Sequence, residues 1–412
     1  MRMIRSVLVA AGLFAMALPA QAAEKLVIAG RDGGYAKALS KMVELYKAKH
    51  PGLEVERLEL PYGGLLEKVT ISMREKAAAY DVIMLDDTWA VEFMSRGWLA
   101  DLDKLGGGID SDFVATAASV SRYPVGEGPH FAVPFVGNVE LFAYRSDLLE
   151  KHAEGVPKSW ADVLAAAKSV AEKEPGVSGV VFRGKKANPI VTGFLPILWA
   201  HGGRVIGEDG TAALDSSAAL DALNLFLELK TYAPKGVETY DSSEVRDALM
   251  QGTTAISIEL WPSWAPSLDD PEKSKVPGKI ELMAPPGQVE GPSPMLGSWL
   301  LAVPADAPNS DLGRDFIDFV TSAENQRLLA LEMGTPPTRA SVYQDADVVA
   351  KYRWYPAQFA ALQNARPRPR ITQWSKVETT LGDYLQLALV GEMSPKAALE
   401  EANDRIARIL SR

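Results

Sequence analysis

The sequence contains no cysteine in its 412 residues. This absence excludes disulfide bonds, thiolate metal sites and cysteine nucleophiles. The fold must therefore be stabilised by the packing of its core and not by covalent cross-links.

Long hydrophobic runs are also scarce. One run, VLVAAGLFAMAL, covers residues 7–18 and follows the basic residues Arg2 and Arg5. A membrane-spanning helix needs about 20 apolar residues, so this run is too short to span. Pro19 ends it, and residues 20–22 (AQA) offer a cleavage site between small residues. This layout indicates a cleaved signal peptide at residues 1–22 and an exported chain that is not membrane-spanning.

An excess of basic charge is missing. The chain has 43 Lys and Arg against 53 Asp and Glu, which gives a formal net charge of −10. An acidic surface repels phosphate backbones, so nucleic acid is not an expected partner. The length that follows the signal peptide, about 390 residues, suits two domains.

Recognisable catalytic motifs are absent as well. The sequence lacks the phosphate-binding G-x-x-x-x-G-K-[ST] loop, the zinc motif H-E-x-x-H and the nucleophile elbow G-x-S-x-G. Its four histidines show no metal-ligand spacing. We therefore expect no catalytic residue, no metal and no cofactor, and a protein that is not an enzyme.

The sequence does contain a regular alternation of strand and helix patterns. Hydrophobic periodicity predicts strands at residues 25–29, 53–60 and 81–85, and helices at 35–49 and 65–79. Such alternation predicts an α/β fold with parallel strands covered by helices. Ligands bind at the carboxyl ends of such strands, which points to the loops at 30–34, 61–64 and 86–89.

Later segments continue the mixture of strands and helices. Strands are predicted within 130–144, 253–259 and 298–303, and helices at 159–173, 215–230, 311–331 and 395–410. Pro-rich pieces at 284–294 and 366–370 are predicted to be loops.

Tryptophan is unusually placed. Several of the nine tryptophans stand beside glycine or proline in predicted loops: Trp89, Trp261, Trp264, Trp299, Trp354 and Trp374. A sugar presents apolar C–H faces, which an indole ring covers, and hydroxyl groups, which carboxylates, amides and guanidinium groups bind. Tryptophans in loops at strand ends therefore indicate a carbohydrate cleft, although each can also be a packing residue.

Two adjacent carboxylates, Asp86 and Asp87, follow the third predicted strand. One interpretation is the acid/base pair of a glycoside hydrolase. Neighbouring residues at a strand end point in different directions, however. We therefore favour one carboxylate that faces a ligand and one that caps the loop.

Segments spread over the whole chain resemble one family. They are YDVIMLDDTWAVEFMSRGWLADLDKL (80–105), AVPFVGNVELFAYRSDLLEK (132–151), PKSWADVLAAA (157–167), AISIELWPSW (255–264), MLGSWLLAVPADAPN (295–309), MGTPPTRASVYQD (333–345) and GEMSPKAALEEA (391–402). In order and spacing they resemble the family 1 extracellular solute-binding proteins of bacterial sugar importers. That group includes maltose- and trehalose-binding proteins.

The resemblance implies a periplasmic-binding-protein-like fold of two lobes, each a mainly parallel sheet flanked by helices, with the ligand cleft between them. It places residues 23–134 and 300–338 in the first lobe, and 135–299 and 339–412 in the second. It further implies a periplasmic monomer that closes about a hinge on a carbohydrate and then docks on the membrane permease of an ABC importer.

Family positions also carry over to single residues. Asp86 and Asp87 match a loop that commonly supplies a ligand carboxylate, and Asn138 stands where similar proteins often have aspartate. The other residues that the resemblance or the loop positions assign to the ligand are Arg31, Asp32, Tyr62, Gly63, Trp89, Glu259, Trp261, Gly297, Trp299 and Arg339.

Two alternatives stay open from the sequence. The same receptor could take an anionic sugar derivative, an opine or a polyamine, because Arg31 and Arg339 leave an anionic ligand possible. A secreted glycoside hydrolase that uses Asp86, Asp87 or Glu259 is the alternative of another class.

Overall fold

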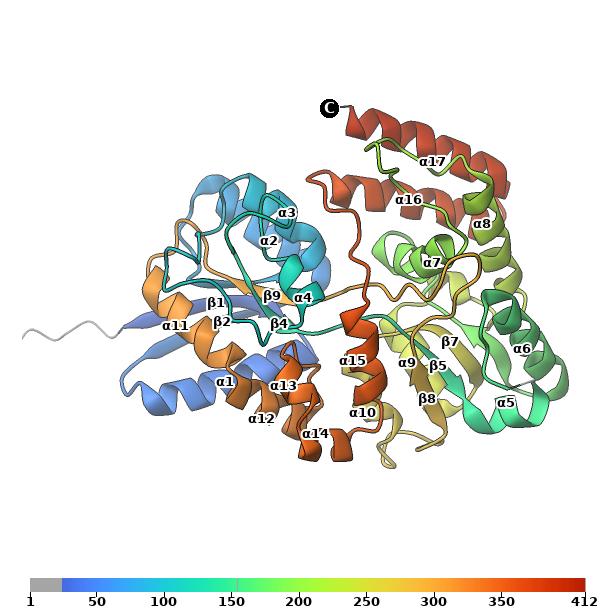
Figure 1. Ribbon diagram of the computed structural model, residues 1–412, viewed down its shortest axis with the longest axis horizontal. Helices are drawn as coiled ribbons and strands as arrows, with labels where there is room; N and C mark the ends of the chain where they lie inside the picture. Colours follow the sequence, from blue (N-terminus) through green and yellow to red (C-terminus); the bar gives the residue numbers. More distant parts are fainter. Residues whose placement is uncertain (1–23, 154, 412) are drawn as a thin grey trace, which may run out of the picture.

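A computed structural model describes residues 24–153 and 155–411. The predicted signal peptide at residues 1–22 lies outside these residues. The chain forms two lobes, each built around its own sheet, and the two lobes stand side by side (Figure 1).

The sheet of the first lobe has the order β2-β1-β3-β9-β4. Its strands are β1 (Lys25–Arg31), β2 (Glu54–Leu60), β3 (Val82–Asp86), β4 (Val133–Val136) and β9 (Trp299–Ala302). β1 pairs in parallel with β2 and β3, whereas β9 runs antiparallel to β3 and β4. The last residue of β3, Asp86, pairs with the first residue of β9, Trp299. This pairing puts two predicted site residues side by side where β3 ends and β9 begins.

The sheet of the second lobe has the order β6-β7-β5-β8. Its strands are β5 (Leu141–Arg145), β6 (Ser178–Val181), β7 (Thr254–Leu260) and β8 (Ile280–Met283). β6 and β7 are parallel, and β5 is antiparallel to both β7 and β8. Leu141 pairs with Leu260, so β5 begins where β7 ends.

The predicted α/β two-lobed fold is confirmed. Both sheets are mixed, but only one strand in each, β9 in the first and β5 in the second, runs against the others. The cause is the path of the chain. β5 and β9 each follow a crossing between the lobes, so they start at the interlobe edge and run away from it, against the strands that end there.

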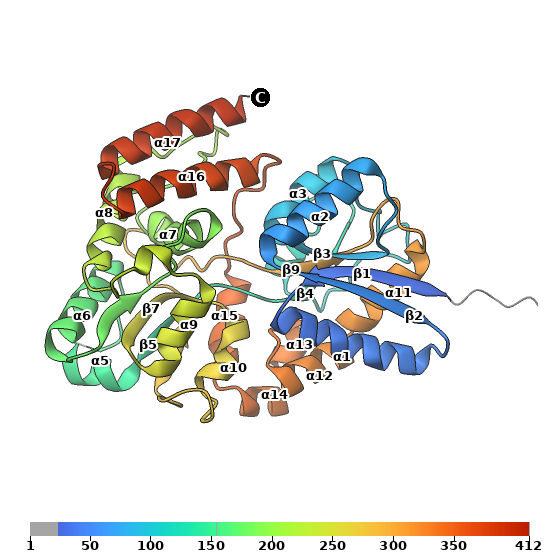
Figure 2. The same ribbon diagram turned by 180° about the vertical axis from the view of Figure 1, so that it is seen from behind.

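Helices cover both faces of the first sheet (Figure 2). They are α1 (Gly34–Lys49), α2 (Tyr62–Glu75), α3 (Asp87–Ser95), α4 (Ala115–Ser119), α11 (Ser310–Thr321) and α12 (Ala323–Met333). The helix predicted at 311–331 is therefore two helices. Ser322 separates them and caps α12 by accepting a hydrogen bond from the Asn325 N–H.

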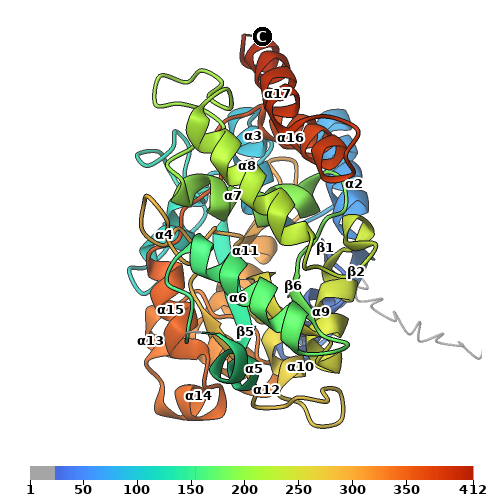
Figure 3. The ribbon, with the colours of Figure 1, turned by 90° about the vertical axis from the view of Figure 1, so that its right-hand side faces the viewer.

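The second sheet is flanked by a larger set of helices, of which α6 and α8 lie in front in Figure 3. They are α5 (Ser146–His152), α6 (Trp160–Lys173), α7 (Asn188–Ala200), α8 (Ser217–Lys230), α9 (Ser242–Gln251), α10 (Ala265–Leu268), α16 (Trp374–Leu389) and α17 (Pro395–Leu410), with short 3-10 turns η1 (Val237–Thr239) and η2 (Pro262–Trp264).

Three short helices connect the lobes on one side: α13 (Ala340–Tyr343), α14 (Ala346–Lys351) and α15 (Tyr355–Gln363). α13 and α14 contact α12 of the first lobe, and α15 contacts both α4 and β8. A segment without helix or strand then leads from α15 to α16 (Figure 1). The residue limits of the two lobes given by the resemblance stay a prediction.

The crossings between the lobes are hydrogen-bonded to one another. The Glu140 N–H donates to the Met295 carbonyl (2.8 Å), and the Leu296 N–H donates to the Arg366 carbonyl (2.9 Å). Three chain segments therefore form a narrow ribbon that joins the lobes. Among the described residues, no helix is long and apolar enough to cross a membrane.

Candidate ligand-binding site

A cleft of about 710 Å³ lies between the two lobes. The first lobe contributes the loop after β1, the start of α2 and the shared end of β3 and β9. The second contributes the start of α7, the segment after β7 and the start of α9. Its polar and aromatic lining includes Arg31, Asp32, Tyr35, Tyr62, Asp86, Asn138, Arg183, Asn188, Thr192, Trp261, Trp264, Trp299 and Arg368.

The cleft brings together eight of the thirteen residues predicted from the sequence. They are Arg31, Asp32, Tyr62, Asp86, Asn138, Trp261, Gly297 and Trp299. Segments more than two hundred residues apart in the chain thus meet at one surface.

The other five do not line it, and their assignment to the ligand stays a prediction. Asp87 and Trp89 are buried behind the surface, 1% and 2% exposed. Glu259 is fully buried, and Gly63 has open space where a side chain would start. Arg339 is held within the first lobe, where its Nη1 lies 2.9 Å from both carboxylate oxygens of Asp110.

Asp86 and Asp87 do not divide the two roles as the strand geometry suggested, because both roles fall on Asp86. Asp86 caps α3 by accepting from the Thr88 N–H (3.0 Å) and it also lines the cleft. Both carboxylates accept from Nη2 of Arg368, at 2.9 Å for Asp86 and 2.7 Å for Asp87.

Arg368 connects this pair to the second lobe. Its Nη1 lies 3.6 Å from Oε1 of Glu378 on α16, and all four side chains are more than nine-tenths buried. Burial raises the pKa of Asp87 to about 7, although Arg368 acts in the opposite direction. One guanidinium group therefore ties the end of β3 to a helix of the other lobe.

The wall of the first lobe is aromatic. Trp299 lies 5.4 Å from Tyr35, 5.9 Å from Tyr62 and 5.6 Å from Trp89, measured between ring centroids. The rings of Tyr62 and Trp89 are 4.8 Å apart. Trp89 thus supports the lining rings from behind.

The wall of the second lobe carries Trp261, which directly follows β7. A Cβ atom added to Gly297 would lie 2.3 Å from Cζ3 of this indole. Only a residue without a side chain leaves room for the ring on the crossing segment.

Arg183 follows β6 and is buried against Glu259. Its backbone N–H donates to Oε1 of Glu259 (2.8 Å), and its Nε donates to Oε2 (2.9 Å). Thr192 on α7 accepts from Nη2 of the same arginine. Glu259 therefore positions Arg183 from behind while Arg183 and Thr192 line the cleft.

Polar atoms without protein partners gather at the same place. Among the described residues, the buried Nε of Arg31, Nε of Arg368, hydroxyls of Tyr62 and Ser298, and Oδ1 of Asn138 have no hydrogen-bond partner. Four of these five residues line the cleft. An unpaired buried polar group costs about 1–3 kcal/mol, so this cluster favours a polar molecule in the cleft.

A further carboxyl group belongs to the first crossing segment, between β4 and β5. Glu140 is fully buried, and neither of its carboxylate oxygens has a partner among the described residues. Burial, and secondarily the negative charge of Glu259, raises the pKa of Glu140 well above its ordinary value.

The start of α7 is held in a strained backbone conformation. Ala187 precedes the helix at φ 74° and ψ −140°, a region that favours glycine. Gly382 of α16 packs on it so closely that an added Cβ would lie 2.7 Å from its Cα. The contact fixes where Asn188 and Thr192 meet the cleft.

Sequence reasoning missed Arg183, Asn188, Thr192 and Arg368 as lining residues. Arg368 lies in the segment RPRPR, which was correctly predicted to be a loop. One feature of the sequence could have pointed to Arg368 as a site residue. Three arginines stand at alternate positions in this loop, which has no helical pattern.

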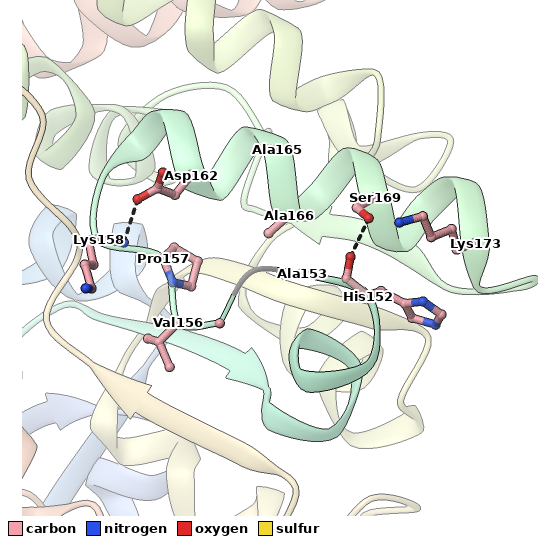
Figure 4. Close-up of a pocket in the computed structure, with 11 residues that line it drawn as sticks. His152, Ala153, Val156, Pro157, Lys158, Asp162, Ala165, Ala166, Ser169 and Lys173 are labelled. Carbon is pink, nitrogen blue, oxygen red and sulfur yellow. Dashed lines mark hydrogen bonds between the residues drawn. The ribbon is translucent and has the colours of Figure 1, made fainter.

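A smaller hollow of about 410 Å³ lies between α5 and α6 on the second lobe (Figure 4). Its lining includes the polar side chains of His152, Lys158, Asp162 and Lys173. None of the residues predicted for the ligand lies there.

The chain belongs to the bacterial extracellular solute-binding protein family, whose model matches residues 32–327. The family resemblance drawn from the sequence is thereby confirmed. This is a family of binding proteins and not of enzymes.

Relatives cover nearly the whole chain. A probable ABC transporter-binding protein of Deinococcus radiodurans is 29% identical and covers 82% of this chain and 81% of its own. A mannitol-binding protein of Pseudomonas aeruginosa is 25% identical over 98% of this chain and 97% of its own.

Solved structures agree with the fold. The maltose-bound MalE3 of T. maritima superposes with a TM-score of 0.85 at 26% identity, over 94% of this chain and all of its own. A solute-binding protein of Agrobacterium radiobacter in complex with ribitol gives the same TM-score at 25% identity, over 94% of this chain and 98% of its own.

Proposed function

We propose that this chain is the substrate-binding protein of an ABC importer that captures a neutral carbohydrate or polyol between its lobes and delivers it to the membrane permease. The observation that carries the proposal is the composition of the cleft. Trp299 from the first lobe and Trp261 from the second line one cavity together with hydrogen-bond donors and acceptors.

The aromatic and polar groups suit a polyhydroxylated ligand. Indole and phenol rings cover C–H faces, and the amide of Asn138 can both donate and accept. Its Nδ2 donates to the Tyr35 hydroxyl (2.8 Å), while its Oδ1 has no partner among the described residues. A ligand hydroxyl, which also donates and accepts, matches such groups.

The arginines of the cleft favour a neutral ligand over an anionic one, whereas Lys37, which also lines the cleft, has no ion pair among the described residues. Arg31 is paired with Asp32 (2.6 Å), Arg183 with Glu259 (2.9 Å), and Arg368 with Asp86 and Asp87. An anionic sugar or opine would need cations that are free of carboxylates. These arginines act instead as fixed donors whose charge is already compensated.

The relatives support the same class of ligand. The mannitol-binding protein of Pseudomonas aeruginosa, the ribitol complex from Agrobacterium radiobacter and the maltose-bound MalE3 of T. maritima all take neutral polyols or sugars. We extend this class, and not any single compound, to this chain.

Closure of the two lobes about the hinge tells the permease that a ligand is bound. The lobes are joined by crossing segments, and ligand contacts come from both sides of the cleft, so a bound solute holds the lobes together. The signal peptide predicted at residues 1–22 supports delivery of the monomer to the periplasm, where the closed form meets the permease.

A glycoside hydrolase is a weaker interpretation. Asp86, Asp87 and Glu259 would supply its carboxylates, yet each is engaged by an arginine. Two of the three are also buried behind the cleft surface. Such carboxylates act as positioning groups for Arg368 and Arg183.

A thermal-shift screen of residues 23–412 tests the proposal. Neutral polyols, monosaccharides and disaccharides are compared with acidic sugars, opines and polyamines. A ligand at 100 times its Kd raises the free energy of unfolding by about 2.7 kcal/mol. We expect a shift confined to neutral polyols or sugars. A shift with charged compounds alone would overturn the ligand class, and turnover of a glycoside would overturn the receptor function.

A further inference from the structure

The guanidinium group of Arg31 sits among three aromatic rings of the first lobe. Its Cζ lies 5.8 Å from the ring centroid of Tyr35, 5.8 Å from that of Tyr62 and 5.5 Å from that of Trp299. We call these three rings the aromatic cage. Arrangements of this kind attract cations through the negative faces of the rings.

The aromatic cage is built on fixed elements. Trp299 is only 5% exposed and is the first residue of β9, paired with Asp86 of β3. Tyr62 is the first residue of α2 and packs on Trp89, which is 2% exposed. Trp299 and Tyr62, two of the three rings, are therefore held by contacts other than those with Arg31.

Two hydrogen bonds hold the guanidinium group of Arg31 among the three rings. Its Nη1 donates to Oδ1 of Asp32 (2.6 Å) and to the Leu60 carbonyl (3.2 Å). The side chain of Asp32 is 46% exposed and lies beside the cage through this contact with Arg31. Three aromatic faces with one carboxylate are the chemistry that recognises quaternary ammonium groups.

We propose that Arg31 is a specificity-determining residue that occupies the aromatic cage of its own chain and so excludes cationic ligands from the cleft. The inference rests on the proposed function, because it concerns the same cleft. It also explains how a wall rich in aromatic rings and carboxylates can serve an uncharged ligand: the cationic subsite is filled by the protein.

The test uses calorimetric titration of the full chain with tetramethylammonium chloride, with sodium chloride at equal ionic strength as the blank. We expect no saturable binding by the wild type and at least about tenfold stronger association by R31A. R31M fills the cage without a charge and R31K keeps a cation there, so neither should gain affinity. R31A/W299A removes one ring and should lose the gain.

Circular dichroism and the melting temperature establish that each variant is folded, and R31S replaces R31A if that variant is not. Folded R31A or R31S that binds tetramethylammonium no better than the wild type would overturn the inference. So would a gain that persists in R31A/W299A. A gain in R31A supports the inference even if every neutral sugar and polyol fails in the thermal-shift screen, a failure that would count against the proposed function alone.

Discussion

Arg183 and Glu259 form a doubly connected pair at the back of the cleft. The backbone N–H of Arg183 donates to Oε1 of Glu259 (2.8 Å) and its Nε donates to Oε2 (2.9 Å). Glu259 is fully buried at the end of β7, whereas Arg183 follows β6 and faces the cavity. The carboxylate therefore fixes the direction of a guanidinium group that the ligand can meet.

Replacing this carboxylate is expected to weaken both folding and binding. E259Q removes the nearer of the two counter-charges of buried Arg183, since Oδ1 of Asp241 lies 3.8 Å from its Nη1, and costs up to about 3–5 kcal/mol in the free energy of unfolding. Urea denaturation measures the loss. E281Q is the matched control, because Glu281 pairs with Arg353 while 42% exposed, and such a pair contributes about 0–1 kcal/mol. Equal effects of the two substitutions would contradict this account.

The contact between Gly297 and Trp261 gives a second prediction. G297A places a methyl group 2.3 Å from the indole, so the ring must move. We expect ligand affinity to fall about tenfold or more, since one aromatic contact is worth about 1.4 kcal/mol. G291A is the control, because an added Cβ there meets nothing within 4 Å. Unchanged affinity in G297A would show that Trp261 does not contact the ligand.

Glu140 predicts an unusual pH dependence of stability. Its raised pKa means that the folded protein holds a proton that the unfolded chain loses above about pH 4.3. Because the folded state keeps this proton to higher pH than the unfolded chain, the free energy of unfolding falls as pH rises. Glu140 contributes up to about 1.4 kcal/mol per pH unit to this fall. Asp87 acts in the same direction up to about pH 7.

The measurement is urea denaturation between pH 5 and pH 8 of the wild type and E140Q. The free energy of unfolding of the wild type should fall across this interval, and that of E140Q should fall less. In E140Q the plot of this free energy against pH should flatten above about pH 7, the pKa of Asp87. The groups that act on Glu140 are Glu259, Arg183 and Arg368. Identical slopes would mean that Glu140 keeps the same charge throughout.

The contact between Ala187 and Gly382 gives a third test of stability. G382A should lower the free energy of unfolding by about 1–3 kcal/mol, because its Cβ would lie 2.7 Å from the Ala187 Cα. A187G should raise it by about 1 kcal/mol by relieving the positive φ. G63A, in a helix with open space around it, is the control and should be neutral or stabilising. A neutral G382A would contradict the packing described here.

Much of the fold follows from local patterns in the sequence. The strands at β1, β2, β3 and β7 and most long helices match their predicted ranges within a few residues. Period-two and period-3.6 patterns report such elements because one face of each is buried. The direction of β5 and β9 could not be predicted, since it depends on where the chain crosses between lobes.

The candidate site was only partly predictable for a similar reason. Asp86, Trp261 and Trp299 stand at strand ends, where sequence alone points to a ligand. Arg183 carries no comparable pattern, and the alternating arginines at 366–370 do not show that Arg368 is the one that reaches the site, because both roles come from partners far away in the chain, Glu259 and Asp86. Burial of a charged side chain is set by tertiary contacts and leaves no local trace.

The most direct test of the central claim is a calorimetric titration of residues 23–412 with neutral polyols, monosaccharides and disaccharides, repeated on W261A and W299A. The account predicts saturable binding of one ligand per chain for at least one neutral compound, with affinity reduced in both variants. Binding that both variants retain in full, or no binding of any neutral polyol or sugar by the folded wild type, would contradict it.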